Sequence, residues 1–135
     1  MTTMITDELK KKLEKRKEIE LLDIREIEMW DADLSGWDLS RTDFSLSSFH
    51  HVSFDGADMQ GCAVENALFD DCSFRGTCFR HANLQGAAMR YDDLSGADIS
   101  GANLFSAVLE HANLSGFISD EDTKFFRLYC PEKGA

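Results

Sequence analysis

The chain has 135 residues, enough for one small domain, and carries 25 acidic against 14 basic side chains, a net charge of −11 with the histidines neutral. Such an acidic chain repels nucleic-acid phosphates, which disfavours direct binding of DNA or RNA. No apolar run approaches the roughly 18 residues that span a bilayer, and the amino terminus lacks the apolar stretch of a signal peptide. We therefore expect a cytoplasmic protein that does not enter a membrane.

Residues 1–21 are predicted to form an N-terminal capping helix. Residues 6–20 contain no Gly or Pro, Thr6 is expected as the N-cap, and Asp7 and Glu8 fall in the first turn, where negative charge is favoured. The helix has only a thin apolar stripe, formed by Leu9, Leu13 and Ile19. We expect it to cover the end of a core that other residues build.

A five-residue period dominates the rest of the chain. From Leu34 to Leu114 every fifth residue is apolar, 17 in succession, which independent draws at 43% hydrophobic content would give with a probability on the order of 10⁻⁶. Two places before each of these central residues stands a small residue, alanine at nine of the 17 positions, and only Trp37 and Asp92 break the rule. Helices repeat every 3.6 residues and strands every 2, so the spacing indicates a short strand followed by a corner. In this interpretation positions 0 and −2 point inward, and position −1 points outward.

Residues 97–101 (Ala-Asp-Ile-Ser-Gly) and 102–106 (Ala-Asn-Leu-Phe-Ser) resemble the pentapeptide repeat family, whose consensus is Ala-Asp/Asn-Leu-x-x. The resemblance covers at least residues 32–116. It implies an all-β solenoid, a right-handed four-sided β-helix with 20 residues per coil. Because the same offsets begin near residue 22, we predict a β-helix of just under five coils over residues 22–116 and a short C-terminal cap or tail over residues 117–135.

Grouping every twentieth residue predicts four faces, each named by the central residues that it stacks. Face 1 stacks Leu34, Phe54, Phe74, Leu94 and Leu114, face 2 stacks Leu39, Met59, Phe79 and Ile99, face 3 stacks Phe44, Val64, Leu84 and Leu104, and face 4 stacks Phe49, Phe69, Met89 and Leu109. Glycine follows each face 1 centre by two residues, which predicts type II corners with positive φ. On face 4 the same place holds His51, Asp71, Tyr91 and His111. There we expect a different turn type without positive φ.

Both ends of a stacked β-helix need a cover, because unpaired strand edges pair with other chains. At the C-terminal end, residues 119–122 are predicted to form one short helical turn, and aromatic side chains at positions 125, 126 and 129 give the tail something to bury.

No catalytic, cofactor or metal site emerges from the sequence. The four histidines share no ligand spacing with cysteines or carboxylates and are interpreted as solvated surface residues. The four cysteines show no paired spacing and are expected to be free thiols, with Cys62 and Cys72 inward and Cys78 outward. Asp92 replaces an inward alanine and is predicted to accept hydrogen bonds from corner amides. The prediction is therefore no enzyme and no cofactor.

The first candidate surface is an apolar stripe on face 4. Its outward −1 positions begin with Ser48, and Phe105 lies outward at the preceding corner. The predicted partner-binding residues are Leu68, Ala88, Val108 and Phe105. Apolar strips rimmed by charge commonly mark contacts. Three occupants are left open: the chain's own tail, a second copy forming a homodimer, or a separate protein partner.

The second candidate surface is acidic. It consists of Asp33 and Asp93 on face 1 with Asp38, Asp58 and Asp98 on face 2. A row of carboxylates at duplex-like spacing would imitate nucleic-acid phosphates, and the resemblance extends to quinolone-resistance proteins that bind DNA gyrase. A DNA mimic directed at gyrase or topoisomerase is therefore the alternative function. We expect instead that these residues keep the shaft soluble, and we predict a non-enzymatic structural or protein-interaction module.

Overall fold

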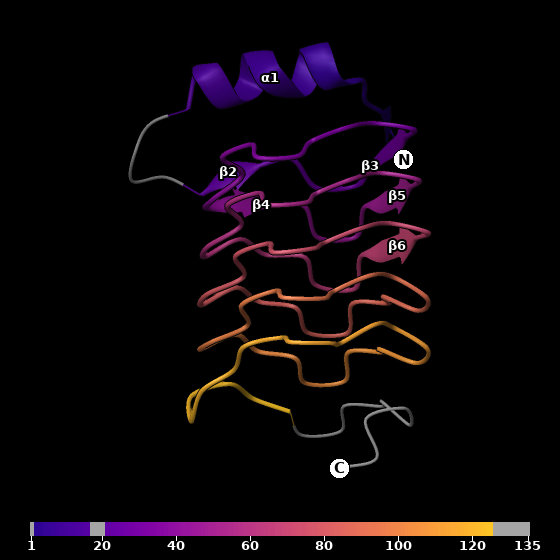
Figure 1. The fold of residues 1–135 in the computed structure, drawn as a ribbon. Helices are drawn as coiled ribbons and strands as arrows, with labels where there is room; N and C mark the ends of the chain where they lie inside the picture. Colours follow the sequence, from indigo (N-terminus) through magenta and orange to yellow (C-terminus); the bar gives the residue numbers. More distant parts are fainter. Residues whose placement is uncertain (1, 17–20, 126–135) are drawn as a thin grey trace.

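In the computed structural model, which describes residues 2–16 and 21–125, the chain winds into a stack of similar coils (Figure 1). The elements are β1 (Thr2–Thr3), α1 (Thr6–Glu14), β2 (Leu22–Asp23), β3 (Ile27–Trp30), β4 (Thr42–Asp43), β5 (Ser48–His50) and β6 (Leu68–Asp70). All paired strands run parallel, in the order β1-β3-β5-β6 in one sheet and β2-β4 in the other. Nowhere in the described ranges is there a helix long and apolar enough to cross a membrane.

The stacking register is 20 residues, as the five-residue period predicts. Within the sheet, Ser48 pairs with Leu68, and beyond β6 isolated bridges continue the register from Leu68 to Ala88 and on to Val108. The face 1 ladder shows the same register in its hydrogen bonds: Phe54 donates its amide to Ser73 and Phe74 donates its amide to Asp93, both at 2.7 Å. Residues that share a predicted face therefore lie on successive rungs.

The core is a column of stacked phenyl rings. Phe54 and Phe74 stack at a centroid distance of 4.8 Å with 3° between their planes, and Phe49 and Phe69 stack at 5.2 Å and 6°. The two stacks also contact each other edge to face, with Phe69 and Phe74 centroids 5.0 Å apart. All four rings are at most 1% exposed. The small inward residues at the −2 positions leave room for these rings. The central and −2 positions of the repeat therefore pack into one core.

A left-handed backbone conformation recurs at every corner. The residue two places after each central residue has positive φ, from Glu26 through Gly116, at eleven non-glycine and eight glycine positions. The prediction for face 4 was therefore wrong, because φ is 56° at His51, 54° at Asp71, 62° at Tyr91 and 63° at His111. The corner amide donates to the next coil, as from His51 to the Asp70 carbonyl at 2.9 Å, and this bond offsets the modest cost of the conformation.

The N-terminal end of the stack is covered by both a helix and a strand. Helix α1 lies across this end (Figure 1), and its Leu9 is fully buried. Arg16, just past the helix, donates to the Ser40 carbonyl at 2.6 Å and to the Asp38 carboxylate at 3.0 Å. The predicted N-cap was wrong: Ile5 occupies that place, without a side-chain bond, and Thr6 is the first helical residue. The remaining predicted helical residues 17–20, including Ile19, lie outside the described residues.

Strand β1 was not predicted. It pairs with β3 through Thr3 and Glu28, and the Met4 amide donates to the Glu28 carbonyl at 2.8 Å. The backbone of β1 thus adds a rung to face 4 at the N-terminal edge. The open edge of β3 is closed by a strand, because the backbone amides and carbonyls of a strand can pair with those along the edge.

At the C-terminal end, pairing continues beyond residue 116. Asp98 pairs with Ile118, and Asn103 pairs with Lys124, so one extra residue is accommodated at the corner between them. Residues 119–122 form a turn in place of the predicted helical turn, because the Asp120 carboxylate accepts the amides of Gly101 at 2.9 Å and of residue 122 at 3.0 Å. Residues 126–135, with Cys130 and most of the aromatic tail, lie outside the described residues.

Candidate interaction surfaces

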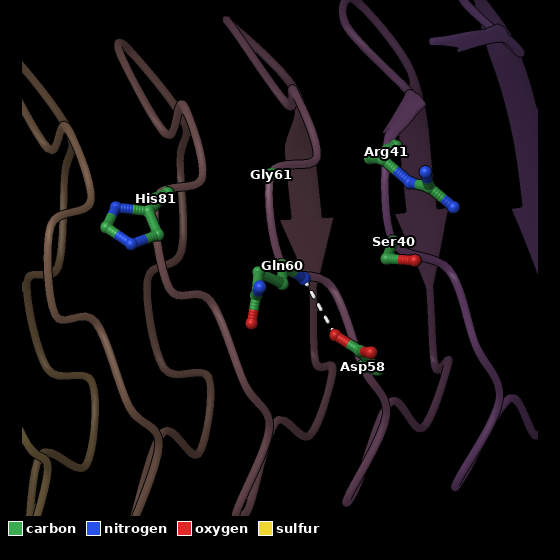
Figure 2. Close-up of a pocket in the computed structure, with 6 residues that line it drawn as sticks. All are labelled: Ser40, Arg41, Asp58, Gln60, Gly61 and His81. Carbon is green, nitrogen blue, oxygen red and sulfur yellow. Dashed lines mark hydrogen bonds between the residues drawn. The ribbon is translucent and has the colours of Figure 1, made fainter. Parts of the chain in front are cut away.

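A shallow hollow of about 420 Å³ opens at the corner between faces 2 and 3 (Figure 2). Its lining comes from three neighbouring coils: Ser40, Arg41, Asp58, Gln60, Gly61 and His81. Arg41 and His81 lie on either side of Gly61, and the Asp58 carboxylate is held by the Gln60 amide at 3.0 Å (Figure 2). The hollow contains no cysteine or paired carboxylates, and its Ser40 and His81 come from coils on either side of Gly61, with the Ser40 hydroxyl donating to Asp38 at 2.5 Å, so they do not form a nucleophile with its base.

The cysteines are not poised for chemistry. Burial raises the pKa of the Cys62 and Cys72 thiols, which disfavours the reactive thiolate. Cys62, Cys72 and the half-buried Cys78 are all free, as predicted. Within residues 2–16 and 21–125, no group of three or more His, Cys, Asp or Glu side chains is placed to hold a metal ion.

Outward Asp and Asn side chains on faces 1, 2 and 3 accept hydrogen bonds from nearby backbone amides. Each of the ten at a −1 place accepts the amide two residues later, as Asp33 does from Ser35 at 3.0 Å. This bond fixes the corner that follows, in the manner of an Asx turn. The consensus Asp or Asn is thereby explained without a binding role.

The predicted acidic surface is interrupted and partly neutralised. On face 1, two serines lie on the rungs between Asp33 and Asp93, and on face 2 Cys78 separates Asp58 from Asp98. Arg80 lies 3.4 Å from the Asp98 carboxylate, and Arg16 pairs with Asp38. Hydrogen bonds from Ser35 and Ser40 lower the pKa of Asp33 and Asp38 respectively. The five residues therefore do not form an unbroken row of free carboxylates.

Face 4 brings three of the four predicted partner-binding residues into one column. Leu68, Ala88 and Val108 lie on successive rungs, and Leu68 is 43% exposed while Ala88 and Val108 are half-buried. Phe105 is half-buried at the preceding corner. This face also has the longest strands, β3, β5 and β6, and its pairing continues as isolated bridges through Ala88 and Val108. The result is the most continuous sheet of the molecule.

Two exposed aromatic rings on face 4 were missed by sequence reasoning. Trp30, 53% exposed, stacks on His50 at 3.9 Å, and Tyr91, 69% exposed, stacks on His111 at 4.7 Å. The +2 column of face 4 contained Tyr91 and was interpreted only as a turn position, while extending the +1 column back to residue 30 would have found Trp30. The interpretation of His50 as a solvated residue was wrong: its side chain is 13% exposed, because the Trp30 ring covers it.

Face 4 also concentrates carboxylates that no backbone amide occupies. They are Glu28, Asp31, Asp70, Asp71 and Glu110, and among the described residues none accepts an amide hydrogen bond. His50 lies 3.4 Å from Asp70, and His51 lies 3.4 Å from Asp71. The one arginine of this face, Arg90, lies 3.4 Å from Glu110. Five carboxylates against one arginine make this surface rich in acidic side chains beside its apolar column.

Asp92 is fully buried behind the corner that follows face 4. At most other corners the amide at the −2 place bonds back to the central carbonyl, as Ala57 does to Phe54 at 2.9 Å. The Cys72 amide instead donates to the Asp92 carboxylate at 2.8 Å, as predicted for an inward polar residue, and the second carboxylate oxygen has no partner. Burial raises the pKa of Asp92 to about 8, against the Cys72 hydrogen bond, which lowers it. Asp92 is thus a substitute hydrogen-bond acceptor inside the corner.

The family model for pentapeptide repeats matches eight copies, over residues 31–63, 60–90 and 93–118. Among curated proteins, no match to the chain was found. A solved pentapeptide repeat protein from the thylakoid lumen of Arabidopsis thaliana is 28% identical, with a TM-score of 0.58 over 70% of this chain and 61% of that one. The chain thus spans less than two thirds of that relative's length.

Two further solved structures are similar at lower identity. A pentapeptide repeat protein from Nostoc PCC 7120 is 16% identical, with a TM-score of 0.55 over 88% of this chain and 98% of that one. QnrB1, a plasmid-mediated fluoroquinolone resistance protein, is 18% identical with a TM-score of 0.40 over 85% of this chain and 71% of that one, too low to carry an argument about function. Since the repeat matches extend over more than half of the sequence and the coils stack in the same register, the chain belongs to the pentapeptide repeat family.

Proposed function

We propose that the chain is a non-enzymatic protein-interaction module that binds another protein through face 4. The single observation behind this proposal is the apolar column of Leu68, which is 43% exposed, with the half-buried Ala88 and Val108 on the two rungs that follow the four-stranded sheet. An apolar strip of this kind rimmed by charge fits a contact surface, and a regular sheet presents it without rearrangement on binding.

The shaft that presents this surface is a right-handed four-sided β-helix of just under five coils. Left-handed corners at every fifth residue from Glu26 to Gly116 support the coil count, at four corners per coil. The phenyl stack along the axis supports a stiff body, since each ring is held by the rungs above and below. A location in the cytoplasm stays a prediction.

The absence of catalysis in this proposal rests on the chemistry of the described residues. The two inward thiols are held protonated by burial, and the hollow beside Asp58 is open and lacks a nucleophile with its base. A convex stack gives a substrate no enclosed site, whereas it gives a partner a flat one.

Site-specific photo-crosslinking in the native cells tests the proposal. A benzophenone side chain at position 68 should form an adduct with one protein, and the same group at position 103, the equivalent −1 place on face 3, should not. Leu68 and Asn103 both occupy outward −1 places, Leu68 exposed on face 4 and Asn103 half-buried on face 3. Equal adducts at both positions, or adducts at position 103 alone, would reject face 4 as the binding surface.

The alternative, an acidic mimic of DNA that binds gyrase or topoisomerase, rests on the five-residue acidic surface of faces 1 and 2. The interruption of that surface by serines and Cys78 weakens it. A gyrase supercoiling assay separates the two functions. We expect no inhibition at high protein concentration, and clear inhibition at low micromolar concentration would favour the mimic.

A further inference from the structure

The exposed apolar groups of face 4 lie beside its carboxylates. Leu68 occupies the −1 place of one coil, and Asp70 and Asp71 occupy the +1 and +2 places of the same coil, with exposed fractions of 43% for Leu68 and of 63% and 70% for the two carboxylate side chains. Side chains two residues apart on one strand point to the same side, about 7 Å from each other. A segment lying on the apolar column therefore passes within reach of both carboxylates.

The Asp70 and Asp71 carboxylates can pair with cations of a partner. Among the described residues, the Asp70 and Asp71 carboxylates each lie 3.4 Å from a histidine ring, and no lysine or arginine pairs with either of them. Glu110 is paired with Arg90, the only arginine or lysine of the face within the described ranges. Lysine or arginine side chains of a partner would meet carboxylates that neither a backbone amide nor another cation already occupies.

The exposed rings of face 4 favour the same partner chemistry. Trp30 and Tyr91 each cover a histidine with one side of the ring and leave more than half of the side chain exposed. A guanidinium or ammonium group is attracted to the face of such a ring. Aromatic residues and unneutralised carboxylates together select cations, while the Leu68 column selects apolar side chains.

A second copy of the chain is a poor occupant of this surface. If two copies faced each other through face 4, the five carboxylates and one arginine of one copy would lie against the same residues of the other. Both chains also carry a net charge of −11. Like charges across an interface cost free energy and slow the encounter. The charge of the surface calls for an oppositely charged partner.

We infer that face 4 binds a segment of another protein in which basic residues are interspersed with apolar ones. This inference rests on the proposed function of face 4 and names the class of its partner. The apolar side chains of the segment lie on the column of Leu68, Ala88 and Val108, and its lysines or arginines contact Asp70, Asp71 and the rings of Trp30 and Tyr91.

Selection from a library of random twelve-residue peptides, displayed on phage and panned on the immobilised full chain, tests the inference. We expect enrichment of peptides that combine Lys or Arg with Leu, Ile, Phe or Trp. For a synthetic copy of the enriched peptide, Leu68→Ser should weaken binding about fivefold and Asp70→Asn with Asp71→Asn about tenfold, with a loss of salt dependence. The matched control, Glu121→Gln with Asp122→Asn, removes two adjacent exposed carboxylates at the C-terminal end and should change the affinity less than about twofold.

The possible outcomes distinguish the class of partner from the proposed role of face 4 as a binding surface. Acidic or uncharged peptides that lose binding with Leu68→Ser would overturn the partner class and leave face 4 as the binding surface. Basic peptides that bind every variant equally would overturn both. If the chain selects no peptide and sediments as a dimer that Leu68→Ser separates, a second copy is the occupant. If the crosslinker at position 68 forms an adduct with residues 126–135 of the same chain, the tail is the occupant. Either result overturns the inference.

Discussion

Face 4 and the pair of faces 1 and 2 both carry carboxylates, but the two regions use them differently. On faces 1 and 2 the outward aspartates accept amides of their own corners, as Asp33 does from Ser35 and Asp58 from Gln60, both at 3.0 Å. On face 4, Asp70 and Asp71 have no amide and only a histidine each. A carboxylate that already completes a turn is part of the fold, whereas one without such a bond is available to a ligand.

Net charge alone does not show which carboxylates of a repeat protein are held by their own backbone and which are not. Seven of the 25 acidic residues are aspartates at the −1 place, where the hydrogen bond to the corner amide explains them. The availability of a charged group depends on its hydrogen bonds, which the −1, +1 and +2 places determine. Four predictions use this difference, beginning with the largest expected effect.

The two regions share one core, so a change in that core should affect both. Phe74 is fully buried and stacks on Phe54 at 4.8 Å. We expect Phe74→Ala to lower the free energy of unfolding by about 3–5 kcal/mol, because it leaves a cavity that stacked coils cannot close. Urea denaturation followed by circular dichroism measures the loss. A change below about 1 kcal/mol would contradict a shared stack.

The buried carboxylate behind face 4 should make stability depend on pH in the opposite direction to the outward carboxylates. The pKa of Asp92 is about 8 in the folded chain against 3.8 as the ordinary value, so its protonated form is favoured by folding. Its contribution is complete below about pH 4 and is lost as the pH rises towards 8. We expect the free energy of unfolding to fall by roughly 1 kcal/mol per pH unit between pH 5 and 7.5.

Asp92→Asn should flatten this pH dependence, since an amide keeps the acceptor for Cys72 and does not ionise. Asp93→Asn, at the next position and not fully buried, is the matched control and should keep the slope. The outward carboxylates with lowered pKa, such as Asp33, lose their contribution only as the pH falls below about 4, outside this window. A wild-type stability that rises between pH 5 and 7.5 would contradict the role assigned to Asp92.

A pair of truncations tests the division of carboxylates most directly. Asp58→Ala removes the acceptor of the Gln60 amide and should cost about 1 kcal/mol, in the range of a lost cap or hydrogen bond. Asp70→Ala removes a carboxylate with only a histidine contact and should change stability by less than about 0.5 kcal/mol. Thermal melts of the two variants under one condition give the difference. Equal losses would mean that the carboxylates of face 4 are structural as well.

The smallest effect is expected for the apolar column in the free protein. Leu68→Glu with Val108→Glu changes outward side chains only, so the fold should keep its stability within about 0.5 kcal/mol. Sedimentation should give the same mass for this variant and for the wild type, because two copies facing each other through face 4 would oppose like charges. A wild-type dimer that the double substitution separates would show that the column serves self-association.

The repeat could be predicted from the sequence because one residue pattern decides both strand and stack. Phe54 and Phe74 are 20 residues apart, and their ring stacking follows from the period alone. The backbone at His51 and Tyr91 could not be predicted from residue preference, because the hydrogen bond to the next coil overrides it. The same holds for β1, whose two threonines carry no pattern of their own and pair only because the edge of β3 is open.

The candidate surface was predicted in part. The column of Leu68, Ala88 and Val108 followed from the −1 places, while Trp30 and Tyr91 were missed because the +1 and +2 places were taken as corners. That the aspartates of faces 1 and 2 hold backbone amides required coordinates, since sequence gives their spacing and not their bonds.

The binding role proposed for face 4 can be examined residue by residue in an NMR titration of the labelled 15.2 kDa chain with the enriched basic and apolar peptide. We expect chemical-shift changes confined to face 4, at Leu68, Asp70, Asp71, Ala88 and Tyr91, and none at Asn83 and Asn103 on face 3. Changes centred on Asp33, Asp58 and Asp98, with face 4 unaffected, would contradict it.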